Sequence, residues 1–71
     1  MARISAELRR FRLHYDLTQA QAADLLGVSL TSYSRFERQE RVPPYREMQR
    51  LRATMERIDQ GDYPDMGFQR R

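Results

Sequence analysis

Two helix starts that lie close together in the middle of the chain constrain its fold more than any other feature. Thr18 with Gln21 three residues later is typical of a capping box, in which each side chain bonds the backbone N–H of the other residue. Gly27 favours the left-handed conformation that ends a helix, and Ser29 is a preferred N-cap for the next one. The chain is therefore predicted to fold two short helices here that cross steeply, because so short a turn leaves no other arrangement.

Apolar stripes at helical spacing flank this central unit on both sides. The first has steps of four, three and four and consists of Ile4, Leu8, Phe11 and Tyr15, with Ser5 as its expected N-cap. The second follows two prolines and consists of Tyr45, Met48, Leu51, Met55 and Ile58. We therefore expect an all-α domain over residues 1–60 and an irregular tail over 61–71, with helices over residues 6–15, 19–26, 30–37 and 45–58.

The size and composition of the chain exclude several classes of protein. With 71 residues it can bury only one modest core. It has no cysteine, which excludes disulfides and thiolate metal sites. No run approaches the roughly 20 apolar residues that a bilayer crossing needs, and arginines interrupt the N-terminus where a signal segment would be apolar. We expect a cytoplasmic protein without a membrane segment, metal site, cofactor or small-molecule ligand.

The basic side chains point to an anionic partner. All 13 basic residues are arginine, the net charge is +3 and the sequence pI is near 10.0. A guanidinium group has a planar fork that binds phosphate, and the O6 and N7 acceptors of guanine, through two hydrogen bonds. Nucleic acid is therefore a better candidate than an acidic membrane surface.

The central unit resembles a known family of DNA-binding proteins. Ala23 is small where the two helices would approach closely, and Val28 follows the turn glycine. Together with its flanks, the run LTQAQAADLLGVSLTSYSRFERQERVPP resembles the helix-turn-helix of the Cro and lambda-repressor type, often called the Xre family, over about Leu8 to Leu51. The resemblance implies a small bundle of four or five helices that regulates transcription. Two features depart from it: Gln39 replaces the usual glycine after the third helix, and one long helix follows Pro44, as in compact phage and plasmid regulators.

The outward face of the predicted helix over 30–37 has the side chains that a major groove would accept. Short polar residues lie near its start and longer donors follow, which lets the backbone approach the bases closely. We predict that bases are read by Leu30, Thr31, Ser34 and Arg35. The competing interpretation is a solvated helix face.

A second set of residues is expected to contact phosphates. Gln19 opens a helix whose free N–H groups favour an anion, and the resemblance implies the same contact. The predicted set consists of Gln19, Ser29, Ser32, Arg38 and Arg12. For the two serines the alternative is simple capping. The resemblance also implies that Arg12 and Glu37 form a partly buried ion pair that presents the arginine to a phosphate; the alternative is two unrelated surface charges.

These observations favour a sequence-specific regulator of transcription that binds double-stranded DNA. We expect a repressor that binds a palindromic operator as a homodimer, because one such unit reads only a few base pairs. The expected dimer surface is helix four plus the tail, with Met55, Ile58, Tyr63, Met66 and Phe68. An antitoxin that binds a toxin and regulates its own operon is the alternative. A membrane-active peptide would not explain the caps and the turn glycine, and no catalytic constellation is visible.

Overall fold

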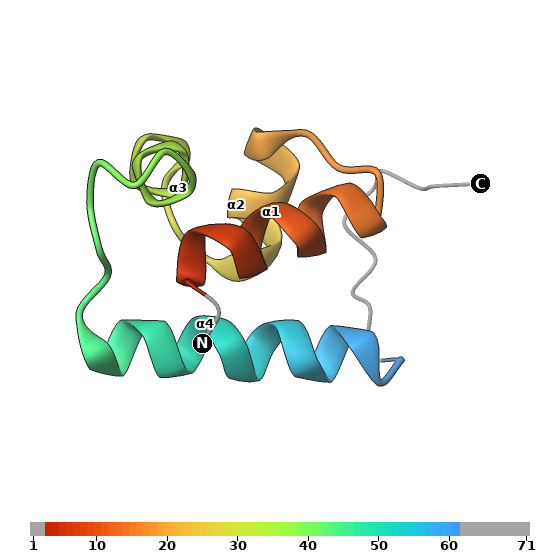
Figure 1. The fold of residues 1–71 in the computed structure, drawn as a ribbon. Coiled ribbons are helices and arrows are strands. Elements are labelled where there is room, and N and C mark those ends of the chain that lie inside the picture. Colours follow the sequence, from red (N-terminus) through yellow and green to blue (C-terminus); the bar gives the residue numbers. More distant parts are fainter. Residues whose placement is uncertain (1–2, 62–71) are drawn as a thin grey trace.

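The computed structural model describes residues 3–61, and four helices account for most of them (Figure 1). These helices are α1 (Ile4–His14), α2 (Gln19–Leu26), α3 (Leu30–Glu37) and α4 (Tyr45–Asp59). Residues 3–61 contain no strand, so the prediction of a small all-α bundle is confirmed. The predicted bounds of α2 and α3 are correct, and α4 ends one residue later than expected.

The predicted start of α1 is wrong. The helix begins at Ile4, and Arg3 precedes it in an extended conformation without a side-chain hydrogen bond to the helix. Ser5 lies inside the helix and is buried rather than acting as a cap. Because Ile4 is buried as well, extending the helix to include it adds an apolar side chain to the core. Burying an isoleucine side chain stabilises a protein by about 1.5–3 kcal/mol, which exceeds the stabilisation of about 1 kcal/mol expected from a serine cap.

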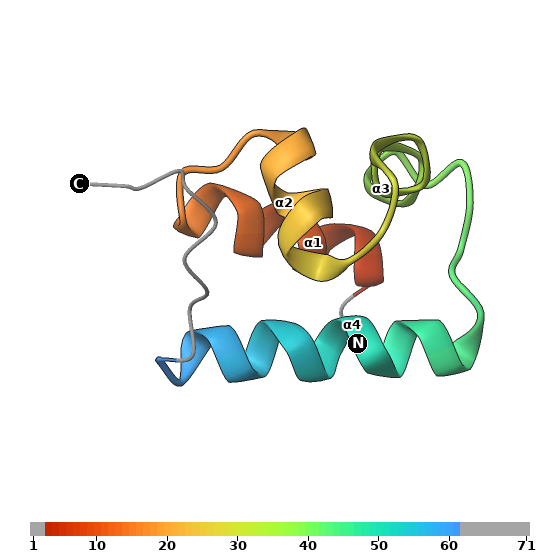
Figure 2. The same ribbon diagram turned by 180° about the vertical axis from the view of Figure 1, so that it is seen from behind.

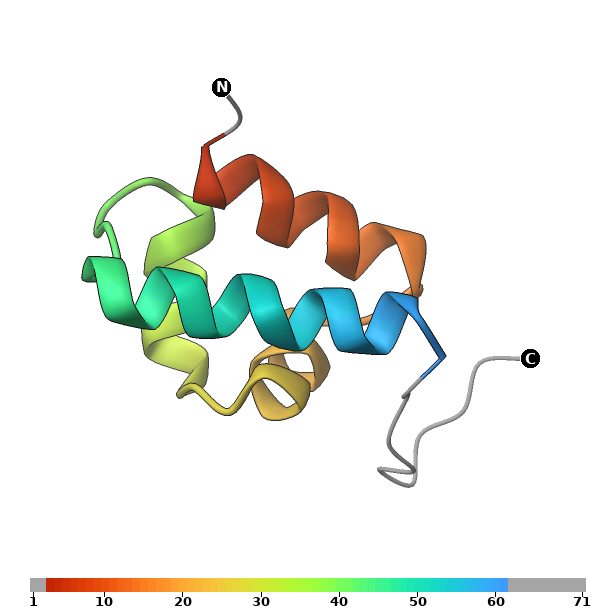
Figure 3. The same cartoon turned by 90° about the horizontal axis from the view of Figure 1, so that it is seen from below.

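Helices α1 and α4 lie side by side and run in the same direction (Figure 3). Side-chain hydrogen bonds connect the two helices near the beginning and at the end of α1. Arg52 Nε donates to Glu7 Oε1 at 2.8 Å, and the Tyr15 hydroxyl donates to Asp59 Oδ1 at 2.5 Å. Figure 1 shows α3 nearly end-on, so it crosses both helices steeply. Seen from behind in Figure 2, α2 lies in front of α1, and a short turn carries the chain from it to α3.

Each helix contributes one large, fully buried side chain to a single core. These four residues are Leu8, Leu26, Tyr33 and Leu51. Around them the core contains Ile4, Phe11, Leu17, Ala22, Ala23, Leu25, Phe36, Met55 and Ile58. Tyr45 does not belong to it, contrary to the predicted stripe: this first residue of α4 is 72% exposed because it precedes the part of the helix that covers the core. Its hydroxyl instead accepts a hydrogen bond from Gln49 at 2.9 Å.

The predicted caps of α2 and α3 are confirmed. Thr18 Oγ1 accepts from the Gln21 N–H at 3.1 Å, and Gln21 Oε1 accepts from the Thr18 N–H at 2.9 Å. Ser29 Oγ accepts from the Ser32 N–H at 3.1 Å. These bonds satisfy N–H groups that have no partner within their own helix, and they fix where each helix begins.

The first three helices end in the same backbone motif. A residue with positive φ follows each helix: Asp16 (58°), Gly27 (75°) and Gln39 (63°). The next N–H then bonds the carbonyl five residues earlier, at 2.9 Å for Leu17, 3.0 Å for Val28 and 2.9 Å for Glu40. This is the Schellman arrangement, which usually has glycine at the left-handed position. The motif after α3 therefore forms without glycine, at a conformational cost.

We predict that Gln39→Gly stabilises the protein by about 0.5–1 kcal/mol, because relief of the left-handed strain exceeds the entropy that glycine adds to the unfolded chain. Gln60→Gly is the matched control, since Gln60 follows α4 with φ −85° and has no strain to relieve. Urea unfolding of both variants measures the difference. Destabilisation by both substitutions to the same extent would contradict a strained Gln39.

Candidate nucleic-acid interface

A buried carboxylate joins the three helices that form the candidate interface. Glu37 is the last residue of α3, and its side chain is only 2% exposed. Arg12 of α1 donates to it from Nε at 2.8 Å and from Nη2 at 3.2 Å. Gln19 of α2 donates from Nε2 at 3.1 Å, and the Tyr33 hydroxyl of α3 donates at 2.6 Å. The structure thus places Arg12 and Glu37 in a two-bond ion pair and adds two neutral donors to it.

The hydrogen bonds decide the ionisation of this group. Burial by itself raises the pKa of Glu37, but the hydrogen bonds from Arg12, Tyr33 and Gln19 outweigh burial and bring its pKa below the ordinary value. Burial and the hydrogen bond to Glu37 raise the pKa of the Tyr33 phenol, so this hydroxyl keeps its proton. The hydrogen bond to Glu37 also raises the pKa of Arg12. At neutral pH the carboxylate is therefore charged and has donors on each side.

The four predicted base-reading residues lie together. With Gln19 and Arg38 they line one shallow depression, whose residues are Gln19, Leu30, Thr31, Ser34, Arg35 and Arg38. Leu30 is 49% exposed, and Arg35 is exposed as well. Within residues 3–61, Arg35 has no hydrogen bond or ion pair. Its guanidinium is free to bind an external acceptor.

Two residues predicted to contact phosphates, Gln19 and Arg12, both bind the Glu37 carboxylate. Each has further N–H donors that this carboxylate does not use. The Gln19 amide nitrogen has two hydrogens, and one bonds Glu37. Arg12 is 18% exposed, and three of its five N–H donors are used, the third by the Leu17 carbonyl at 3.3 Å. The remaining donors lie beside the N-terminus of α2, where free backbone N–H groups favour an anion.

Ser29 and Ser32 lie apart from this depression. Both line a neighbouring one, next to Arg41. The Ser29 hydroxyl oxygen caps α3, as the capping interpretation proposed, and the Ser32 hydroxyl accepts from Arg41 Nη1 at 3.4 Å. Arg41 itself lies over the Phe36 ring, 5.7 Å from its centroid.

Arg41 is a candidate phosphate contact that the sequence analysis did not identify. A basic residue in the loop that directly follows the reading helix is the signal that could have revealed it. Its position beside Ser32 nevertheless depends on how the loop folds back, which local sequence does not determine.

Two residues proposed for the dimer surface are part of the core instead. Met55 is 7% exposed and Ile58 is 3% exposed, because α4 packs that face onto the rest of the same chain. The prediction that they contact a second copy is therefore wrong. The other three proposed residues, Tyr63, Met66 and Phe68, lie outside the described residues.

Residues 3–61 offer no cluster of three metal-ligating side chains. His14 is exposed and meets the Tyr15 ring edge-on, with centroids 4.8 Å apart. None of the helices in this part of the chain has the length and apolar character needed to cross a bilayer.

Comparison with known families assigns the chain to a domain family. A family model described as a helix-turn-helix domain matches residues 3–55, which includes all of α1, α2 and α3 and most of α4. Comparison with curated proteins and with solved structures gives no significant match.

We predict that Glu37→Gln destabilises the protein by about 3 kcal/mol at neutral pH. The substitution removes the negative charge of the pair and leaves the partly buried Arg12 guanidinium without a counter-charge. Since the pKa of Glu37 is lowered by folding, the ionised carboxylate stabilises the protein above its ordinary pKa of 4.5, and this contribution is lost as the pH falls through the folded-state pKa. The stability difference between parent and variant should therefore shrink in acid.

Denaturant unfolding over a pH series measures this difference. Glu56→Gln is the control, because Glu56 is exposed on α4 and should change stability by less than about 0.5 kcal/mol. A Glu37→Gln effect as small as that of the control at neutral pH would show that the carboxylate network contributes little.

Proposed function

Because the chain belongs to the helix-turn-helix domain family, we propose that it is a sequence-specific regulator of transcription that binds double-stranded DNA. The observation that carries this proposal is the single depression that joins Gln19 at the start of α2 to the outward side chains of α3. An α-helix fits the major groove of B-DNA, where each base pair presents a distinct pattern of donors and acceptors.

The outward side chains of α3 have different roles in base recognition. Arg35 lies one helical turn after Thr31, so both follow the same groove. The fork of Arg35 matches the O6 and N7 acceptors of guanine, and Leu30 suits the methyl group of thymine. Thr31 and Ser34 are short, which allows the backbone of α3 to come close to the bases.

Phosphate contacts fix this helix in the groove on both sides. On the α2 side we assign them to Gln19 and Arg12, whose free donors lie beside the N-terminus of that helix. On the loop side we assign them to Ser29 and Ser32, and now also to Arg41. Arg38 belongs to the reading depression and contacts the backbone from there. Such contacts set orientation and carry no sequence information.

We further propose that the protein is a repressor that binds a palindromic operator as a homodimer. One reading helix covers only a few base pairs, so useful specificity needs two half-sites about 34–36 Å apart. The resemblance to the Cro and lambda-repressor type supports this assembly. Because Met55 and Ile58 are buried within one copy, we assign the contact between the two copies to other residues.

We predict that Arg35→Ala weakens binding to the preferred duplex by about 1–3 kcal/mol and abolishes the preference at one base-pair position in each half-site. Thermal stability should change by less than about 0.5 kcal/mol, because the side chain is exposed. The preferred duplex is obtained by selection from a random pool with the parent protein, and both proteins are then titrated against its single-position variants.

The control is Arg46→Ala, which removes an exposed arginine from α4. If Arg35→Ala lowers the affinity for every duplex equally and leaves all preferences intact, Arg35 contacts a phosphate and the assignment to a base is wrong. A parent protein that selects no preferred duplex would contradict the proposed function.

A further inference from the structure

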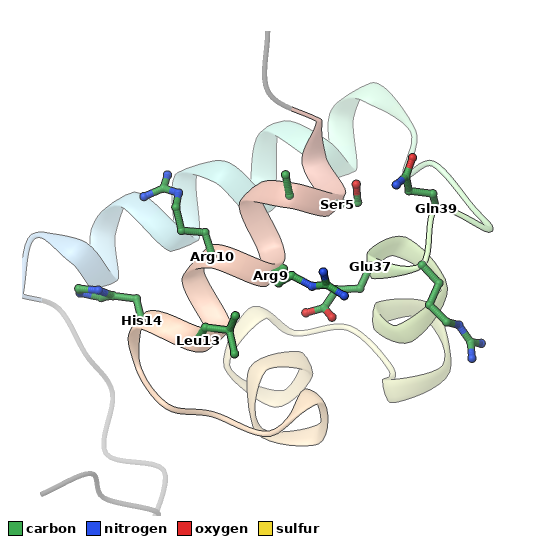
Figure 4. Close-up of a pocket in the computed structure, with 9 residues that line it drawn as sticks. Ser5, Arg9, Arg10, Leu13, His14, Glu37 and Gln39 are labelled. Atoms are coloured by element: carbon green, nitrogen blue, oxygen red, sulfur yellow. The ribbon is translucent and has the colours of Figure 1, made fainter.

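A second groove opens beside the reading face, between α1 and the end of α3 (Figure 4). Arg9, Arg10 and Leu13 line it from α1, and Glu37 and Arg38 line it from α3 and the residue after it. Arg38 also lines the reading depression. The two hollows are therefore neighbours on one surface.

The residues that line the groove do not neutralise its positive charge, although Arg10 also lines a neighbouring hollow with Glu7, Glu56 and Asp59. Arg9 and Arg10 are exposed, and neither has a hydrogen bond or ion pair in this part of the chain. In contrast, Arg50 and Arg52 on α4 each bind a carboxylate, at 2.6 and 2.8 Å. The one carboxylate among the described lining residues is Glu37, which is almost fully buried and already paired with Arg12.

The side chains in this groove point in two directions. Figure 4 shows Arg9 extending from α1 toward Glu37 at the end of α3, while Arg10 extends away from α3, on the side of α1 where it lines a hollow with residues of α4. The exposed guanidinium groups of Arg35, Arg38 and Arg9 thus form a basic path from the reading helix onto α1, and Arg10 points away from it.

We propose that this path binds the sugar-phosphate backbone of the DNA that flanks the bases read by α3. The inference rests on the proposed function, since a duplex held by α3 continues past the end of that helix. A DNA duplex presents one negative charge for about every 1.7 Å of its length, and a series of exposed guanidinium groups matches such a repeating anion. Arg35 and Arg9 have no hydrogen bond or ion pair in residues 3–61, and Arg38 has only a solvent-exposed ion pair with Glu40 at 3.2 Å, of a kind that contributes little. The flank contact adds affinity for any sequence and leaves base preference to α3.

The test compares two variants with the same change in net charge. Arg9→Gln alters the groove, and Arg46→Gln alters an exposed position on α4. Each variant is titrated with the selected duplex, in long and flank-trimmed forms, between about 50 and 200 mM salt. Thermal unfolding establishes that both variants are folded.

We expect the groove variant to lose about one unit of the slope of log K against log salt for each bound copy, and the control variant to keep the parent slope. Trimming the flanks should weaken the parent and the control but not the groove variant. Base preferences should be unchanged in all three.

Equal slopes for the two variants, or equal losses on trimming, would overturn the flank contact and leave the proposed function standing. If the parent binds no duplex, both proposals are wrong. If the groove variant changes base preference, the path reads bases and the assignment to the backbone is overturned.

Discussion

The arrangement of α1, α2 and α3 depends on the buried carboxylate of Glu37. Burying an isolated charge is very costly, and it is tolerated only when hydrogen bonds and an opposite charge replace the lost water. Here one donor comes from each of the three helices, through Arg12, Gln19 and Tyr33. Any shift of one helix against the others would break a bond to this carboxylate, so the group fixes their relative positions.

The same network connects the core to the surface. Tyr33 is fully buried and its hydroxyl also lies 3.1 Å from the Leu8 carbonyl, whereas Gln19 and Arg12 reach solvent with donors to spare. A second tie acts on the turn between α2 and α3, where Arg50 Nη1 of α4 donates to the Leu26 carbonyl at 3.0 Å. The turn that positions α3 is thus held by a side chain from α4 as well as by its own left-handed glycine.

Local signals predicted the central unit well because they are sufficient to define it. A capping box, a left-handed glycine and a serine cap determine where α2 begins and ends and where α3 begins, whatever surrounds them. The start of α1 was missed because Ser5 has the chemistry of a cap while its burial is a tertiary effect. In the same way, an apolar stripe shows which face of α4 is buried. It does not show whether that face packs against the same chain or against a second copy.

In the candidate site, too, residues set by local sequence could be predicted, and residues set by tertiary packing could not. Residues on α3 could be assigned to one face from helical periodicity, and the structure brings all four together with Gln19. Arg41 and Arg9 could not be assigned in this way, because their positions near α3 depend on how a loop and another helix pack against it. The two serines were correctly placed at the start of α3, with Ser29 as its N-cap, but they line the hollow beside Arg41 rather than the depression that Arg35 lines.

A double-mutant cycle between Arg12 and Glu37 tests most directly whether this carboxylate organises the domain. The free energy of unfolding is measured for the parent, Arg12→Gln, Glu37→Gln and the double variant, at low and at high salt. We predict that the double variant loses less than the sum of the single losses, with a coupling of about 1–3 kcal/mol. The coupling should persist at high salt, because the pair is shielded from solvent ions. Additive losses, or a coupling that salt removes, would show that the two residues are independent surface charges and would contradict this account.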